Sequence, residues 1–193
     1  MFTIIPAKPF HEAKTRLSSV LTPDQRAALS QRLLHHTIDV ASHIGDVVVI
    51  SRSSAVRRLA KQAGAWALVE GESELNAALC QAAHWVAACH RQPILILPGD
   101  LPLLTTADLT EMMALHRPAP SMVIAPCRRD SGTNALFLDP PDVIDFQFGP
   151  NSFAKHMQAA QTKGIAVAVY HSPSIAFDVD LPEDVILWGV EIK

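Results

Sequence analysis

The chain has 193 residues, of which 49% are hydrophobic and 18% are charged, and its formal net charge at pH 7 is −3. This length and balance exclude a disordered chain and predict one domain, residues 1–193, with a hydrophobic core. The lack of a basic excess argues against nucleic acid as a partner.

Signals for secretion and membrane insertion are missing. The N-terminal apolar segment reaches Lys8 after a few residues, which is too short for the core of a signal peptide, and no apolar run approaches the roughly 18 residues of a membrane span. The scattered, odd-numbered cysteines argue against a disulfide framework: Cys80, Cys89 and Cys127. We therefore expect a cytoplasmic protein with no membrane partner.

The first part of the chain alternates predicted strands and helices. Thr22-Pro23-Asp24-Gln25 marks a helix start, because Thr22 can cap, proline suits the first turn and Gln25 completes a capping box. In chain order, strands are expected at residues 2–7, 47–50, 66–69 and 94–97, and helices at 22–43, 53–63, 74–89 and 106–115.

The predicted strands of the second part lie closer together along the chain. They span residues 122–125, 134–138 and 165–170, and helices are expected at 150–163 and 181–190. Strand–helix alternation predicts a mostly parallel sheet with helices on both faces, and the later spacing predicts an antiparallel or mixed portion. The expected fold class is therefore α/β, with a mixed, mostly parallel sheet.

An acidic residue follows the apolar run at 94–97. Four consecutive aliphatic residues lie between Pro93 and Pro98, which is typical of a strand buried on both faces, and Gly99 and Asp100 follow. Open α/β sheets bind ligands at the carboxyl ends of their strands, so Asp100 is a candidate ligand residue. The alternative is an aspartate that only caps the next helix or turn.

A second acidic group lies far along the chain, in Phe177-Asp178-Val179-Asp180. In an extended segment, Asp178 and Asp180 point to one face. Two carboxylates so close repel each other unless a cation lies between them, and Mg²⁺ prefers oxygen ligands. The alternative is that Asp180 caps the helix that follows, and both interpretations can hold together.

Three cations follow the first predicted strand: Lys8, Lys14 and Arg16. Phosphates often bind at this position in α/β folds, and Lys and Arg can neutralise their oxygens. The segment has neither the glycine pattern of a Rossmann dinucleotide site nor that of a P-loop. The alternative is a solvated basic loop.

Two further segments can offer backbone N–H groups to an anion. The turn Asp130-Ser131-Gly132-Thr133-Asn134 contains a glycine and a hydroxyl, and Gly149-Pro150-Asn151-Ser152 precedes a predicted helix. Each segment taken alone is also compatible with an ordinary turn or helix cap.

Seven groups of residues follow one another along the chain: Pro6-Ala7-Lys8-Pro9, Ala13-Lys14-Thr15-Arg16-Leu17, Leu75-Asn76-Ala77-Ala78-Leu79, Gly99-Asp100-Leu101-Pro102-Leu103-Leu104, Asp130 with Gly132-Thr133-Asn134-Ala135-Leu136, Phe148-Gly149-Pro150 with Ser152-Phe153 and His156, and Phe177-Asp178-Val179-Asp180 with Pro182-Glu183-Asp184. Together they resemble the 2-phospholactate guanylyltransferase family of deazaflavin (F420-type) coenzyme biosynthesis. The resemblance implies a GT-A-like nucleotidyltransferase fold. It also implies a Mg²⁺-dependent transfer of GMP from GTP to a small phosphorylated carboxylic acid: 2-phospholactate, phosphoenolpyruvate or 3-phosphoglycerate.

The resemblance also assigns roles to individual residues. Lys8 would contact the phosphates of the nucleotide and of the acceptor, and Lys14 and Arg16 are expected to help neutralise them. The expected metal ligands are Asp100, Asp178 and Asp180. The remaining assignments are Asn76 and Gly99 to the nucleotide, and Thr133, Asn134, Gly149 and Ser152 to the acceptor.

Two positions depart from the family pattern, because Glu74 and Asn151 stand where the family usually has Gly. The first lies beside the expected nucleotide contacts and the second in the expected acceptor pocket, so the acceptor stays open. Two other functions also stay open: a cytidylyl- or sugar-phosphate-type nucleotidyltransferase, although the usual Gly-rich first loop is missing, and a non-catalytic nucleotide-binding domain. The sequence does not decide the oligomeric state, and a homodimer is one of the states that stay open.

Overall fold

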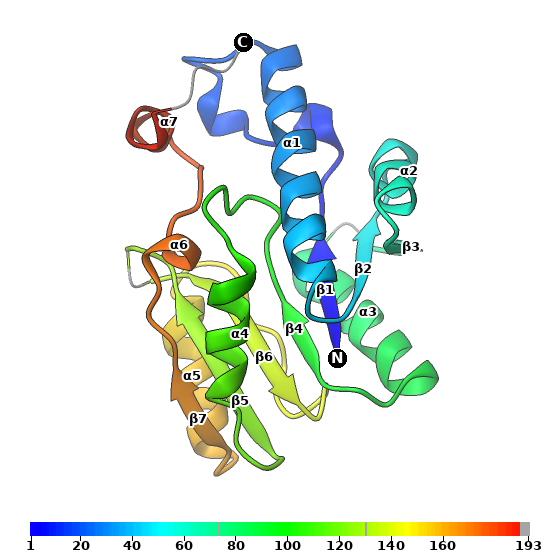
Figure 1. The fold of residues 1–193 in the computed structure, drawn as a ribbon, viewed down its shortest axis with the longest axis vertical. Coiled ribbons are helices and arrows are strands. Elements are labelled where there is room, and N and C mark those ends of the chain that lie inside the picture. The colour runs from blue at the N-terminus through cyan, green and yellow to red at the C-terminus, as the bar shows by residue number, and fades with distance from the viewer. Residues whose placement is uncertain (73, 130, 190–193) are drawn as a thin grey trace.

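Figure 1 shows the computed structural model, which describes residues 1–72, 74–129 and 131–189. Its centre is a seven-stranded sheet with the order β3-β2-β1-β4-β6-β5-β7. The strands are β1 (Phe2–Pro6), β2 (Asp46–Ser51), β3 (Trp66–Val69), β4 (Ile94–Ile96), β5 (Ser121–Pro126), β6 (Thr133–Asp139) and β7 (Ala166–Val169). Strand β6 pairs antiparallel with β4 and β5, and the four other pairings of the described strands are parallel.

Helices cover both faces of this sheet (Figure 1). They are α1 (Pro23–Ser42), α2 (Ser54–Gln62), α3 (Leu75–Cys89), α4 (Thr106–Ala114), α5 (Ser152–Thr162), α6 (Pro173–Ala176) and α7 (Pro182–Trp188). Two 3₁₀ turns, η1 (Phe10–Glu12) and η2 (Thr15–Leu17), lie between β1 and α1.

The sheet separates two hydrophobic cores. On one face, Ile5 of β1 packs in a cluster with Leu34 of α1 and with residues of α2 and α4. On the other face, Phe2 and Ile4 pack in a cluster with Leu79 of α3 and with residues of α5. Successive side chains of a strand point to opposite faces, so the inner strand β1 contributes to both cores.

The predicted mixed, mostly parallel sheet with helices on both faces is confirmed. Helix α1 begins with the expected capping box, in which Thr22 and Gln25 exchange two hydrogen bonds of 3.0 and 3.3 Å. The sequence did not predict α6, η1 and η2, because elements of about one turn leave no apolar periodicity to detect. The expected end of the last helix at Val190 lies outside the described residues. No helix in the described part of the chain is long and apolar enough to cross a membrane.

Candidate functional site

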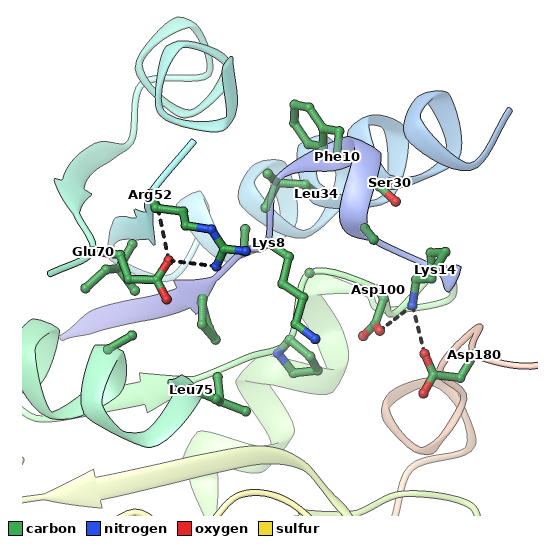
Figure 2. A pocket seen from close by; sticks show the side chains of 17 residues that line it. Lys8, Phe10, Lys14, Ser30, Leu34, Arg52, Glu70, Leu75, Asp100 and Asp180 are labelled. Atoms are coloured by element: carbon green, nitrogen blue, oxygen red, sulfur yellow. Dashed lines mark hydrogen bonds and ion pairs between the residues drawn. The ribbon is translucent and has the colours of Figure 1, made fainter. Parts of the chain in front are cut away.

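A cavity of about 440 Å³ lies at the carboxyl ends of β1, β2, β3 and β4, beside α1 and α3. Part of its wall is apolar and includes Leu34, Ile50 and Leu75. Figure 2 shows that its charged side chains come from segments far apart in sequence: Lys8, Lys14, Arg52, Glu70, Asp100 and Asp180. A cavity with both apolar walls and clustered charge suits a ligand that has an apolar body and an ionic group.

The Lys14 ammonium group joins two of the predicted metal ligands (Figure 2). Its Nζ lies 2.5 Å from Oδ2 of Asp100 and 3.1 Å from Oδ1 of Asp180. Burial alone would lower the pKa of Lys14, but the two carboxylates outweigh it and raise that pKa above its ordinary value. Lys14 is therefore a charged group, 8% exposed, at the junction of three chain segments.

The third predicted ligand, Asp178, lies next to this group. The backbone N–H of Val179 donates to the Asp100 carbonyl oxygen at 3.3 Å, which holds the 178–180 segment against the loop after β4. Burial, followed by the negative charges of Asp100 and Asp180, raises the pKa of Asp178. Three carboxylates thus lie together, and Lys14 and Arg16 form ion pairs with two of them, Asp100 and Asp180.

The carboxylates of Asp100, Asp178 and Asp180 have the negative charge and the oxygen ligands that a metal cation needs. Oδ1 of Asp100 is buried and has no hydrogen-bond partner among the described residues. A buried carboxylate oxygen without a partner is costly, and a hard cation would satisfy it. In the part of the chain that the structure describes, no three Asp, Glu, His or Cys side chains are gathered as ready metal ligands, and the Lys14 ammonium lies between two of the predicted ones.

The two other predicted cations differ in position. Lys8 extends into the cavity, and no hydrogen bond or ion pair joins it to a residue within the described ranges (Figure 2). Arg16 lies at the rim, 71% exposed, with Nη1 at 3.3 Å from Oδ2 of Asp180. Lys8 is therefore free to bind an incoming phosphate, whereas Arg16 already pairs with a carboxylate.

Two predicted acceptor contacts, Thr133 and Ser152, lie together at the start of β6 and of α5. The Thr133 backbone N–H donates to Ser152 Oγ at 3.0 Å, and Thr133 Oγ1 lies 3.1 Å from His156 Nδ1. His156 is fully buried one turn after Ser152 on α5. In the sequence His156 stands out only as part of a motif, and its spacing of four residues from Ser152 is the one signal that places it beside the acceptor contacts.

The hydrogen bonds fix the tautomer of His156. Its Nε2 accepts from the backbone N–H of Gln147 at 3.0 Å, and burial, followed by the charge of Lys155, lowers the pKa of His156 to about 4. The ring is therefore neutral at pH 7, with its proton on Nδ1. Because Nδ1–H donates to Thr133 Oγ1, the Thr133 hydroxyl keeps its own proton for another acceptor.

Two predicted ligand contacts, Asn76 and Asn134, have side chains that hold backbone groups. The Asn76 amide accepts from the Phe148 N–H at 2.8 Å and donates to the Phe148 carbonyl at 3.1 Å, which links α3 to the Gly149 segment. The Asn134 amide donates at 2.9 Å to the Ile175 carbonyl and at 3.4 Å to Asp178 Oδ1. Their direct contact with substrate stays a prediction.

Gly99 lies where the loop after β4 crosses α1. A Cβ atom there would lie 3.2 Å from Cδ1 of Leu34, so glycine permits the close approach of this loop. Its contact with the nucleotide also stays a prediction. Asp130, which the sequence placed in the acceptor turn, lies outside the described residues.

Asp184 caps α7, and Asp180 does not, which corrects one of the alternatives from the sequence. The Asp184 carboxylate accepts from the backbone N–H groups of Asp180 at 2.8 Å and of Leu181 at 2.7 Å, and it pairs with Arg128 and Arg129. Burial would raise the pKa of Asp184, but these partners lower it. In the sequence Asp184 stands out only as part of a motif. Its cap leaves the Asp180 side chain free to face Lys14.

Comparison with known proteins identifies the family. The family model described as "Guanylyl transferase CofC like" matches residues 1–191. The chain belongs to this family. As a guanylyltransferase, it falls outside the cytidylyl and non-catalytic alternatives that the sequence had left open.

Relatives of this guanylyltransferase bear the names of three acceptors. It is 39% identical to a phosphoenolpyruvate guanylyltransferase of Rubrobacter xylanophilus, over 95% of this chain and 91% of the relative. It is 37% identical to a 2-phospho-L-lactate guanylyltransferase of Methanothermobacter thermautotrophicus, over 96% and 84%. It is 32% identical to a 3-phospho-D-glycerate guanylyltransferase of Colwellia psychrerythraea, over 95% and 89%.

Solved structures show the same fold at low sequence identity. A crystal structure described as a putative nucleotide-diphospho-sugar transferase from Desulfovibrio desulfuricans matches with a TM-score of 0.77 and 14% identity, over 97% of this chain and 85% of that one. A 4-diphosphocytidyl-2C-methyl-D-erythritol synthase matches with a TM-score of 0.65 and 10% identity, over 97% and 96%. The predicted GT-A-like nucleotidyltransferase fold is therefore confirmed.

The structure gives a physical reason for both departures from the family pattern. Asn151 has a left-handed backbone with φ of 57°, and asparagine is among the few residues other than glycine that enter this region readily. Glu74 caps α3 by accepting from the N–H groups of Asn76 and Ala77 at 3.0 and 2.8 Å. Gly149, with φ of 126°, retains the glycine that this conformation requires.

The buried neutral His156 predicts a loss of stability in mild acid. The pKa of His156 is about 4 in the folded protein and near 6.5 when unfolded, so its contribution is complete above about pH 6.5 and is lost as the pH falls toward 4. Between pH 7 and pH 5, the free energy of unfolding of the wild type should fall by about 2 kcal/mol more than that of His156→Gln. Urea unfolding at both pH values measures this difference. Equal losses in the two proteins would show that His156 titrates normally in the folded state.

Proposed function

We propose that this guanylyltransferase transfers GMP from GTP to a small acid that carries both a phosphate and a carboxylate, with release of pyrophosphate. The observation that carries the proposal is the cluster of Lys14, Asp100 and Asp180 at one end of the cavity, with Lys8 extending into it. The named acceptors of the relatives, phosphoenolpyruvate, 2-phospho-L-lactate and 3-phospho-D-glycerate, share those two groups.

The reaction needs no general base. The second pKa of a phosphate monoester is about 6, so the acceptor phosphate is largely a dianion at pH 7 and is already a nucleophile. One of its oxygens attacks the α-phosphorus of GTP, a new P–O bond forms, and the bond from the α-phosphorus to the bridging oxygen of pyrophosphate breaks.

The main barrier is repulsion between two polyanions. Lys8 has no competing partner among the described residues and so can bind the phosphates of either substrate. Lys14 and Arg16 add two cations close to Asp180. Fixed cations placed before the reaction stabilise the charge that develops at the transferred phosphoryl group.

Magnesium is the proposed cofactor, with Asp100, Asp178 and Asp180 as its ligands. The unpartnered Oδ1 of Asp100 and the excess of carboxylate over ammonium charge support this assignment. When bound, Mg²⁺ would supply further positive charge to the phosphates of GTP.

We propose that Thr133, Ser152 and Gly149 hold the acceptor. The Thr133 and Ser152 hydroxyls each accept one hydrogen bond from the protein, which leaves both protons available to a carboxylate or phosphate. Asn134, next to Thr133, contacts Asp178, so the acceptor groups adjoin the acidic cluster.

Pyrophosphate release tests the function directly. The purified protein is offered GTP and Mg²⁺ with phosphoenolpyruvate, 2-phospholactate or 3-phosphoglycerate in separate reactions. We expect release with at least one acid, none without an acid, and a product that contains GMP and the acid. Pyrophosphate release that does not depend on any of the acids would contradict the proposed acceptor class.

Removing the Asp100 charge should abolish turnover. Asp100→Asn keeps the size of the side chain but removes a charge that Lys14 and the proposed Mg²⁺ both need. Pyrophosphate release should fall below detection while circular dichroism stays like that of the wild type. Asp142→Asn, in an exposed loop, is the matched control. A turnover of Asp100→Asn near that of the wild type would rule out the metal assignment.

Lys8→Ala should lower kcat/KM at least about tenfold, equivalent to about 1.4 kcal/mol, because the cavity loses a cation that faces the phosphates. Lys61→Ala removes an exposed lysine of α2 and serves as the control for net charge. Initial rates with GTP varied at fixed acceptor measure both variants. If Lys8→Ala and Lys61→Ala behave alike, Lys8 has no part in phosphate binding.

A further inference from the structure

The end of the cavity opposite the acidic cluster carries a second charged group, Arg52 and Glu70 (Figure 2). Arg52 follows β2 and Glu70 follows β3, which is the edge strand of the sheet. Neither residue has a role in the phosphate chemistry described above. Their position in the same cavity makes them candidates to contact a part of GTP other than its phosphates.

The sheet sets the separation between the two ends. Strands β4, β1, β2 and β3 are consecutive neighbours, and Asp100 and Glu70 follow the first and the last of them. Three spacings of roughly 4.8 Å place strands β4 and β3, which Asp100 and Glu70 follow, about 14 Å apart across the sheet. That span suits a nucleotide whose phosphates lie near Asp100 and whose base lies near Glu70.

The contacts of Glu70 leave part of its carboxylate available. Its Oε2 accepts from the Arg52 backbone N–H at 3.0 Å, and Arg52 Nη1 lies 4.0 Å from the same oxygen. The second oxygen, Oε1, has no hydrogen bond to any residue in the described ranges. Arg52 also pairs with Glu12 on its other side, so Arg52 is itself held in place.

The chemistry of this group matches guanine. The guanine edge that carries N1–H and the 2-amino group presents two adjacent donors, which a carboxylate can accept. Adenine and cytosine present a ring-nitrogen acceptor in the middle of the corresponding edge, which a carboxylate repels. Leu75 and Ala78 of α3 and Ile50 of β2 also line this cavity and offer a purine ring an apolar surface.

We propose that Glu70 is the residue that selects guanine, by accepting hydrogen bonds from N1–H and the 2-amino group, and that Arg52 positions its carboxylate. This inference rests on the proposed function, because it concerns the base of the same GTP. A carboxylate at this position stabilises bound guanine through two hydrogen bonds, and it repels bases that place an acceptor atom against it.

The test compares kcat/KM for GTP, ITP and XTP, which differ at position 2 of the purine. ITP lacks the 2-amino group, and XTP has a carbonyl oxygen in its place. The wild type should prefer GTP to ITP at least about tenfold, because a hydrogen bond to a charged group is lost, and should use XTP least. A wild type that uses XTP as well as ITP would already contradict a carboxylate at this edge.

Glu70→Gln is the decisive variant. Its amide oxygen can keep the hydrogen bond from the Arg52 N–H, while its NH2 group presents a donor to the base where the wild type has a second carboxylate oxygen. Its GTP-to-ITP preference should fall to within about threefold, and its XTP-to-GTP ratio should rise at least about tenfold. Glu72→Gln is the matched control: it removes an exposed carboxylate two residues further along the chain, outside the cavity lining, and should leave both ratios unchanged. Melting temperatures and the KM for the acceptor acid show whether each variant is folded and intact.

The outcomes separate the inference from the proposed function. If the wild type releases pyrophosphate from GTP but Glu70→Gln keeps the wild-type ratios, the assignment of Glu70 is wrong and the function stands. If the wild type releases none with any acid, the proposed function fails first. Should Glu70→Gln be unfolded, Glu70→Asp replaces it: the retracted carboxylate should lower kcat/KM for GTP at least about tenfold while GTP stays preferred to XTP.

Discussion

The site depends on one buried ammonium group. Lys14 Nζ bonds to carboxylates that lie 86 and 166 residues further along the chain, so it draws the segment after β1, the loop after β4 and the C-terminal segment to one point. A charge in this position is stable only because it is paired, and the carboxylates in turn need it. Without this interaction, three negative charges would repel one another, and the end of the cavity that they define would change shape.

The backbone around Asp100, Asp178 and Asp180 is held by hydrogen bonds that do not involve Lys14 or Arg16. The Val179 N–H bonds to the Asp100 carbonyl, the Asp184 carboxylate caps the start of α7, and the Asn134 amide bonds to the carbonyl at the end of α6. Each is a bond between polar groups that are at least partly buried and would otherwise lack partners. They direct the carboxylates toward Lys14 by fixing the backbone on either side.

The order of strands and helices was predictable, because continuous apolar runs and the cap at Thr22 are local signals. The acidic positions were predictable as well, since Asp100 follows a buried strand. The bridge made by Lys14, the cap made by Asp184 and the backbone contacts of Asn76 were not, because each depends on which distant segment the fold brings alongside. Glu70 was missed for a simpler reason. A single carboxylate after an edge strand forms no recognisable sequence motif, and only its position in the cavity makes it a candidate ligand residue.

Strand β6 is antiparallel to its neighbours β4 and β5, and this direction bears on how acceptor specificity can change in evolution. The chain reaches the site edge at the end of β5 and returns within a few residues at Thr133, so the groups proposed to hold the acceptor come from one hairpin and one helix start. The charged groups instead come from segments that span nearly the whole chain. The groups proposed to hold the acceptor can therefore change through a few local substitutions while the nucleotide end stays unchanged, consistent with relatives that are named for three different acids.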